Sequence, residues 1–215
     1  MRSESISEII RIASILSVAF PLISYVIKLK QASKPLHLIG GVVVVSALSD
    51  LIAVFFFSNG ESTVLLFNGY YIILFLLLTW FFYNLLTSKM GRSTVLAGLS
   101  IYIGAFIFVS LYVQPFSEYQ TLMWTITGMI MVIFSISYFV HLFSLPLPAN
   151  NYGYVWINSG ILYYFSMNLF LFIMSSYVLT KLEQPIALMI WSFHNVNNVL
   201  KNIIIGFGIS TYSQE

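Results

Sequence analysis

Seven long runs of apolar residues, separated by short polar connections, dominate the pattern of this 215-residue chain. Each run holds about 20 residues or more, the length that an α-helix needs to cross the hydrocarbon core of a bilayer. The pattern therefore predicts an all-α fold, a single polytopic bundle of seven transmembrane helices over residues 1–215. The predicted helices cover residues 8–28, 36–57, 64–87, 94–113, 119–143, 154–180 and 185–210.

Composition supports a membrane-embedded bundle. Charged residues make up 7% of the chain, hydrophobic residues 59%, and the mean hydropathy is +0.92. A soluble domain carries about a quarter charged residues, so the lipid bilayer is the expected environment of this chain. Because no connection is long enough for a separate domain, function is expected in the bundle or at its two ends. We expect a multi-pass protein of the inner or plasma membrane.

The basic residues of the short connections predict the orientation. Five of them fall on the side that also holds the C-terminus, and this excess places that side in the cytoplasm and the N-terminus outside. They are Lys28, Lys30, Lys34, Lys89 and Arg92. The net charge of +2 comes from scattered residues and forms no continuous patch, so no nucleic-acid partner is expected. With no cysteine, the chain has no disulfide, thiolate metal site or cysteine nucleophile.

A stripe of polar residues runs through the last apolar segment. It consists of His194, Asn195, Asn197, Asn198, Lys201 and Asn202. At helical spacing all of them except Asn195 stand on one face. Hydrocarbon rejects so many amides and an ammonium, so the stripe is expected to face protein or water-filled space. The stripe is the first candidate for a ligand-binding site.

Apart from Glu8 at the very start of the first predicted span, Asp50 is the one acidic residue inside a predicted span, and an ionisable group at depth indicates a functional site. Counting 1.5 Å per residue, Asp50 and His194 share a depth of roughly 10–13 Å below the outer surface. We therefore expect Asp50 to face the stripe and to hydrogen-bond His194, Asn195 or Asn198. The alternative is an Asp50 that only ties two helices together.

Lys201 allows two interpretations. Its stem could carry the ammonium toward the cytoplasmic interface. Alternatively, Lys201 in the seventh helix, followed by Gly206-Phe207-Gly208, is similar to the retinal-binding lysine of microbial rhodopsins. That family places a carboxylate counter-ion on the third helix, and 64–87 contains no Asp or Glu. An uncompensated protonated Schiff base is costly at depth, so we expect no retinal and no other cofactor.

Other site chemistry is weaker. His37 and His141 fall at the same membrane face without a third ligand, so we expect polar anchors and no metal site. No nucleophile elbow, phosphate loop or metal-binding histidine motif occurs, which makes an enzyme the third choice.

A faint repeat relates the two halves of the chain. At an offset of 118 residues, Asp50 aligns with Asn168 and Asn84 aligns with Asn202. Each pair falls in corresponding helices of two three-helix units, with the fourth helix as a linker. This 3+1+3 plan predicts a parallel repeat, and it adds Asn168 to the candidate binding residues.

Two resemblances follow. Pro21, the lysines after it and the Lys34-Pro35 turn resemble the layout of the PQ-loop and SWEET transporters, although Pro21-Leu22 stands where that family has Pro-Gln. This resemblance implies a small-solute transporter. The aromatic sixth helix and the Leu200-Lys201-Asn202-Ile203 ending also resemble small uncharacterised bacterial seven-helix proteins, and this resemblance implies a membrane sensor.

Two functions are therefore expected. The first is a receptor-like, non-enzymatic sensor that binds an unknown small molecule in the bundle and acts on a cytoplasmic or membrane signalling partner. The second is a small-solute transporter with a polar path to both faces. A blind outer cavity favours the sensor, and a cavity that runs toward both faces favours the transporter.

Overall fold

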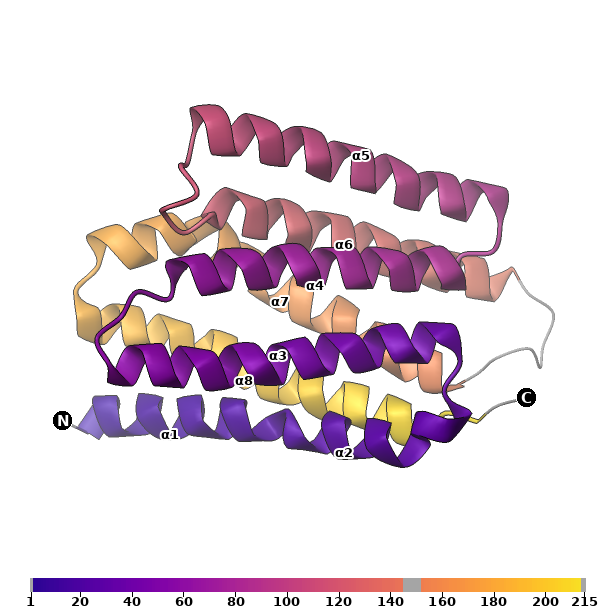
Figure 1. Cartoon of the computed structure of the whole chain (residues 1–215), viewed down its shortest axis with the longest axis horizontal. Coiled ribbons are helices and arrows are strands. Elements are labelled where there is room, and N and C mark those ends of the chain that lie inside the picture. Colours follow the sequence, from indigo (N-terminus) through magenta and orange to yellow (C-terminus); the bar gives the residue numbers. More distant parts are fainter. Residues whose placement is uncertain (1, 145–151, 214–215) are drawn as a thin grey trace.

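The computed structural model describes residues 2–144 and 152–213, and these residues form helices without a strand. The helices are α1 (Arg2–Ser17), α2 (Ala19–Lys28), the 3-10 turn η1 (Leu29–Gln31), α3 (Lys34–Ser58), α4 (Val64–Leu85), α5 (Lys89–Tyr112), α6 (Thr121–Phe143), α7 (Tyr152–Lys181) and α8 (Gln184–Ser210). They run back and forth along one long axis, so that α1 begins at one end and α8 finishes at the other (Figure 1). With α1 and α2 forming one crossing, the seven predicted helices are present.

Six helical segments of the described chain are long and apolar enough to cross a membrane, with α1, α2 and η1 counted together as 6–31. The chain is thus a helical membrane protein. The exception is α8, whose polar stripe lowers its hydropathy. Because α8 packs against α7 on one side and against α1 and α2 on the other, neighbouring helices cover much of its surface.

The first crossing is broken at Val18, between α1 and α2. Pro21 has no backbone N–H, so the carbonyl of Ser17 lacks the donor that would continue the helix. The side chain of Ser17 forms a separate hydrogen bond, in which its hydroxyl donates to the carbonyl of Ser14 at 2.6 Å. The hydrogen bond from the Leu22 amide to the Val18 carbonyl, at 3.1 Å, restarts the helix after the break.

Two helix starts differ from the sequence prediction. The first helix begins at Arg2 and not at residue 8, and α5 begins at Lys89 and not at residue 94. The prediction began each helix close to its apolar run, whereas α5 begins where the Ser88 hydroxyl caps it by accepting a hydrogen bond from the Gly91 amide at 3.0 Å.

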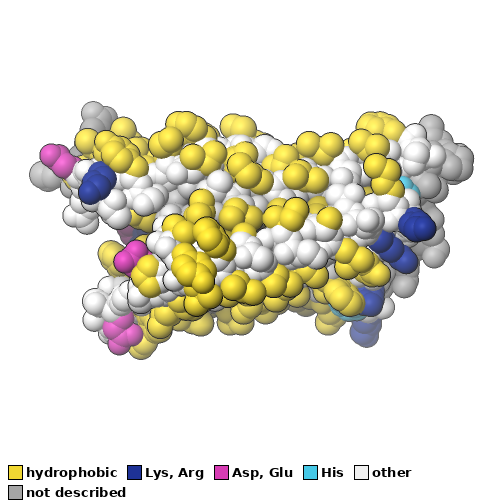
Figure 2. All heavy atoms as spheres, turned by 90° about the horizontal axis from the view of Figure 1, so that it is seen from above, with side chains coloured by type: hydrophobic (Ala, Val, Ile, Leu, Met, Phe, Trp, Pro, Cys, Tyr) yellow, Lys and Arg dark blue, Asp and Glu magenta, His cyan; other side chains and the backbone are white. Residues whose placement is uncertain are grey.

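Charged side chains divide between the two ends of the bundle (Figure 2). One end, called the acidic end here, carries Glu8, Glu61, Glu118 and Glu183 with Arg11 and Lys181. The other, the basic end, carries Lys28, Lys30, Lys34, Lys89 and Arg92. At the basic end two cations rest on aromatic rings at 5.2 Å from the centroid, Lys34 on Trp80 and Arg92 on Tyr83.

The helices pack in an uneven ring. The closest neighbours are α7 with α8, α6 with α7, and α3 with α4, while α1 packs chiefly on α8. α5 lies at the periphery against α6 and α4 (Figure 1). The polar stripe of α8 and the Asp50 side of α3 consequently face a shared interior space.

Candidate functional site: a polar chamber around Asp50

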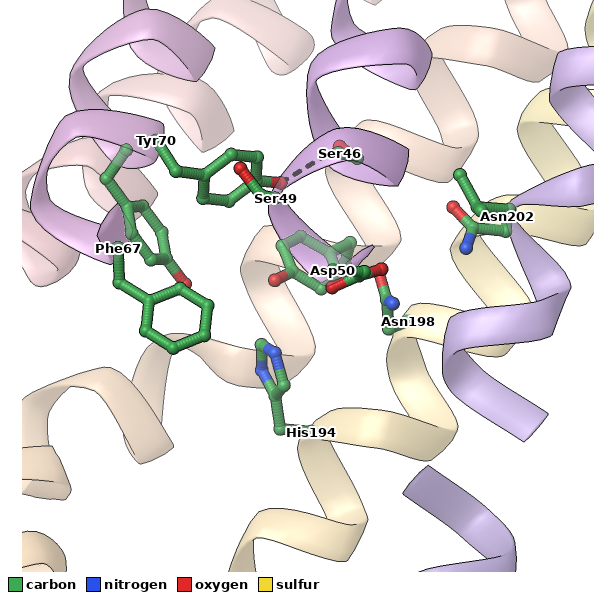
Figure 3. A pocket seen from close by; sticks show the side chains of 11 residues that line it. Ser46, Ser49, Asp50, Phe67, Tyr70, His194, Asn198 and Asn202 are labelled. Atoms are coloured by element: carbon green, nitrogen blue, oxygen red, sulfur yellow. Dashed lines mark hydrogen bonds between the residues drawn. The ribbon is translucent and has the colours of Figure 1, made fainter. Parts of the chain in front are cut away.

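A polar cavity of about 80 Å³, called the chamber from here on, lies between α3, α4, α7, α8 and the break at Val18. Its lining combines hydroxyls, amides, one carboxylate and four aromatic rings: Val18, Ser46, Ser49, Asp50, Phe67, Tyr70, Tyr71, Tyr164, His194, Asn198 and Asn202. Three of these residues, Asp50, His194 and Asn198, approach one another from α3 and α8 in Figure 3. Sequence analysis predicted this meeting of α3 with the polar stripe.

The Asp50 side chain is half-buried and faces the chamber. Within residues 2–144 and 152–213 its carboxylate forms no hydrogen bond and no ion pair. The expected hydrogen bond to His194, Asn195 or Asn198 is therefore not made. The unpaired carboxylate is available to a molecule in the chamber.

His194 sits in an aromatic surround at the edge of the chamber. Its ring lies 5.6 Å from that of Tyr164, 6.0 Å from that of Phe172 and 5.3 Å from that of Trp191, measured between centroids. Its Nδ1 is buried, with no hydrogen-bond partner among the described residues. A buried imidazole nitrogen costs free energy when it is unpaired, so a molecule in the chamber is one way to satisfy it.

The stripe on α8 does not face one neighbour, as its spacing predicts, but divides between two. Toward α1, the Asn198 amide donates to the Ser14 hydroxyl at 2.9 Å and the Asn202 amide donates to the Ser17 hydroxyl at 2.7 Å. Both asparagines also line the chamber. They therefore form one wall of the chamber and hold α1 against α8 at the same time.

Toward α7, Asn197 joins a second polar cluster outside the chamber lining. Its Oδ1 accepts a hydrogen bond from the Tyr163 hydroxyl at 2.8 Å, and its Nδ2 donates to Asn168 Oδ1 at 3.3 Å. Asn168 is fully buried and donates to the carbonyl of Tyr164. Asn168 and Asn197 thus tie α7 to α8, and the half-buried Asn195 is likewise absent from the chamber lining.

Lys201 turns inward. Its ammonium lies 4.6 Å from the centroid of the Tyr164 ring, which itself lines the chamber. This contact overturns the expectation that the stem carries the charge to the cytoplasmic interface. Lys201 and Asp50 are near enough to attract each other, although no direct ion pair joins them within the described chain.

The size of the chamber limits what it can hold. Sites for drug-sized ligands enclose about 300–1,000 Å³, whereas this chamber encloses about 80 Å³. A retinoid attached to Lys201 does not fit this space. The chamber has room for an ion, a very small polar molecule or a few waters, since one water occupies about 30 Å³ in the liquid.

The chamber lies in the acidic half of the bundle. Phe67 is the fourth residue of α4, so the lining comes within about one helical turn of the acidic end. At its other limit, Asn202 lies eight residues before the end of α8, leaving ~12 Å of helix beneath the chamber.

That lower part is tightly packed. A Cβ placed on Gly208 would lie 2.8 Å from the Gly153 carbonyl oxygen, and one placed on Gly160 would lie 2.9 Å from Ile205. A Cβ on Gly206 would overlap the Phe20 ring. At these glycines α8 packs closely against α7 and α2 below the chamber.

Hydrogen bonds and a ring contact also join neighbouring segments at the basic end. Lys28 donates from its ammonium to the Tyr212 carbonyl at 2.8 Å, and the hydroxyls of Ser33 and Tyr154 are hydrogen-bonded. The Tyr154 and Tyr212 rings meet edge to face at 5.5 Å.

The remaining polar candidates serve separate helix contacts. His37 Nδ1 hydrogen-bonds the Tyr25 hydroxyl at 2.9 Å, and His141 Nε2 hydrogen-bonds the Thr87 hydroxyl at 3.3 Å. No three metal-binding side chains gather within the described ranges. Asn84 donates to the carbonyl of Trp80 on its own helix and does not extend the chamber.

Sequence reasoning missed the hydroxyl groups of the site. Ser46 and Ser49 line the chamber beside Asp50, and the Ser46 hydroxyl lies 3.0 Å from that of Tyr70. On the first crossing, Ser14 and Ser17 bind the two asparagines of α8. Their spacing of three residues, which places both on one helix face, was the available signal.

Comparison of the chain with protein-family models, with curated proteins and with solved structures finds no match.

Proposed function

We propose that the chain is a receptor-like membrane sensor that holds a very small polar ligand in the chamber and changes the packing of α1 and α8 on binding. The observation that carries this proposal is a polar chamber near the acidic end above a tightly packed basic half. A blind cavity of this kind suits binding better than passage.

The orientation of the proposal follows from the charges. Short connections rich in Lys and Arg stay in the cytoplasm, so the basic end is assigned to the cytoplasm and the acidic end to the outside. The ligand then enters from outside. Because the two asparagines that bind α1 also form one wall of the chamber, a ligand that contacts this wall acts directly on the α1–α8 contact.

The basic end is where a signalling partner would contact the protein. Its short connections expose cationic side chains such as Lys30 and Lys89. A small shift of α8 at the chamber would reach this end through the close glycine contacts of its last turns, because packed interfaces change between discrete arrangements.

A transporter is the second candidate, and one observation favours it. Val18 lines the chamber and also marks the break between α1 and α2, where Pro21 frees a backbone carbonyl. In many transporters, broken helices of this kind supply backbone groups to the substrate site. A transporter would open the packed basic half during its cycle.

Accessibility of the chamber from each side separates the two functions. The chain contains no cysteine, so single cysteines at Ser46 or Ser49 report on the chamber alone. We expect a small, membrane-impermeant thiol reagent to modify them in proteoliposomes from the acidic side only. Ser62→Cys, exposed at the acidic end, and Met90→Cys, exposed at the basic end, serve as side-specific controls.

The side from which the chamber cysteines are modified distinguishes the two functions. Modification of the chamber cysteines from both sides would favour transport over sensing. Protection from both sides, while the two control cysteines react, would contradict an accessible chamber and with it both functions.

A further inference from the structure

Beside its hydroxyl groups, the chamber offers three side chains whose acceptor oxygens have no partner in the described chain. Asn198 and Asn202 each commit an amide N–H to a serine of α1, and their carbonyl oxygens carry no hydrogen bond within the described chain. The Asp50 carboxylate is likewise unpaired there. A ligand that donates several hydrogen bonds fits this set, whereas an anion would be repelled by Asp50.

Aromatic rings supply the rest of the lining. Phe67, Tyr70, Tyr71 and Tyr164 surround the acceptors, and ring faces attract cations. Tyr164 already makes such a contact within the protein, since the Lys201 ammonium lies 4.6 Å from the centroid of its ring. The wall of the chamber is thus already suited to a primary ammonium group.

Volume narrows the class further. About 80 Å³ accommodates a cation the size of ammonium or methylammonium together with a water or two, but no large quaternary amine. One class of ligand fits the carboxylate, the free amide oxygens, the ring faces and the volume together: a small cation that donates hydrogen bonds.

We propose that the chamber binds a small primary ammonium ion, with the Asp50 carboxylate as its counter-ion, amide oxygens of Asn198 and Asn202 as acceptors, and Tyr164 as a ring-face contact. This inference rests on the proposed function and names its ligand class. The ammonium of Lys201 occupies the ring that the ligand needs, so Lys201 acts as a tethered competitor. Ligand binding displaces the Lys201 ammonium from the Tyr164 ring and in this way changes a contact of α8.

The test measures methylammonium binding to the full chain in nanodiscs, by calorimetry and by the shift in thermal unfolding, at constant ionic strength. We expect saturable binding of methylammonium, and none of tetramethylammonium. Asp50→Asn is expected to weaken binding by roughly tenfold or more, since it removes the charged acceptor. Glu61→Gln, an exposed acidic residue at the same end, is the matched control and should bind as the unchanged protein does.

Lys201→Met gives the sharpest result. Removing a competitor should tighten methylammonium binding several-fold, which loss of folding cannot imitate. Weaker binding in Lys201→Met would overturn the proposal, because it would mean that Lys201 helps to hold the ligand, as for a zwitterion or an anion.

Three further outcomes would also overturn it. Sodium or potassium ions that give the same Asp50-dependent shift at the same concentration would replace the ammonium ion with a metal cation. Absence of methylammonium binding to a chamber that cysteine labelling has shown to be open would reject this ligand and leave the proposed function standing. An inaccessible chamber would reject both.

Discussion

The acidic and basic halves of the bundle differ in what fills the space between their helices. Around Asp50 the helices enclose a polar chamber of about 80 Å³ whose walls are joined by single hydrogen bonds from amides to hydroxyls. Beneath it, glycines of α8 and α7 bring the helices together with almost no intervening side chain. α8 is therefore joined to α1 by single hydrogen bonds in the acidic half and packed closely on α7 and α2 in the basic half.

This difference has a physical origin. Without a hydrophobic driving force between helices in lipid, association depends on close packing and on interhelical hydrogen bonds. The glycine contacts of α8 in the basic half use the first, and the contacts of Asn198 and Asn202 with α1 in the acidic half use the second. An interhelical hydrogen bond in a membrane contributes only ~0.6 kcal/mol on average, so the acidic half can rearrange at small cost.

The largest effect is expected from filling the packed half. Gly208→Leu would force a side chain against the backbone of Gly153 and Ile157, which cannot move aside without separating α7 from α8. We expect a loss of about 3 kcal/mol in the free energy of unfolding, measured by denaturant titration in detergent. Gly104→Leu on α5, where an added Cβ meets no atom within 4 Å, is the matched control. Equal losses in both variants would show that the α7–α8 contact is not special.

A smaller loss is expected where α7 and α8 share buried amides. Asn197→Leu removes the partner of both the Tyr163 hydroxyl and Asn168 Oδ1. Because Asn168 is fully buried, its unpaired oxygen keeps a desolvation cost, and we expect about 2 kcal/mol of destabilisation. Asn195→Leu, half-buried on the same helix with no hydrogen bond shown in the described chain, should cost much less in the same titration. An unchanged stability of Asn197→Leu would mean that this cluster does not stabilise the contact between α7 and α8.

Loosening α1 should cost less again. The double substitution Ser14→Ala, Ser17→Ala removes both hydrogen bonds to Asn198 and Asn202. At ~0.6 kcal/mol for each bond we expect about 1 kcal/mol in total. Hydrogen exchange should rise in α1 and remain slow in α2, where Phe20 still packs against Gly206. Equal rates in both segments would mean that the first crossing moves as one body in spite of its break.

Almost no effect is expected on the peripheral helix. The Ser100 hydroxyl donates to the Leu96 carbonyl on its own helix, and the residue is exposed on α5. Ser100→Ala should change the unfolding free energy by less than about 0.5 kcal/mol. A clear loss of unfolding free energy would mean that α5 contacts a second molecule. Labelling of Ser100→Cys with a lipid-soluble thiol reagent would then show whether this surface is covered.

The helices could be predicted because lipid imposes a simple length and polarity rule on them. Their ends could not always be, since the start of α5 depends on the Ser88 cap and not on apolarity. The break at Val18 follows from Pro21, whose missing N–H is visible in the sequence, but the sequence alone does not tell a break from a gentle bend.

The candidate site was predictable in part. The depth of Asp50 and His194 correctly brought them to one space, because helix rise fixes depth. The division of the stripe was not foreseeable: Asn197 and Asn198 are adjacent in sequence, and only the placement of α8 between two helices sends one toward α7 and the other toward α1. The same placement turned Lys201 onto Tyr164.

The pairing of α1 with α8 also constrains how the protein is made. Ser14 finds its partner 184 residues later in the chain, at Asn198, so the first crossing must wait in the bilayer for the last one to be synthesised. Until then the serines of α1 have no amide to bind and the chamber lacks a wall. A ribosome that stalls before α8 would release an unfinished ring with polar groups open to lipid, the kind of product that membrane proteases remove.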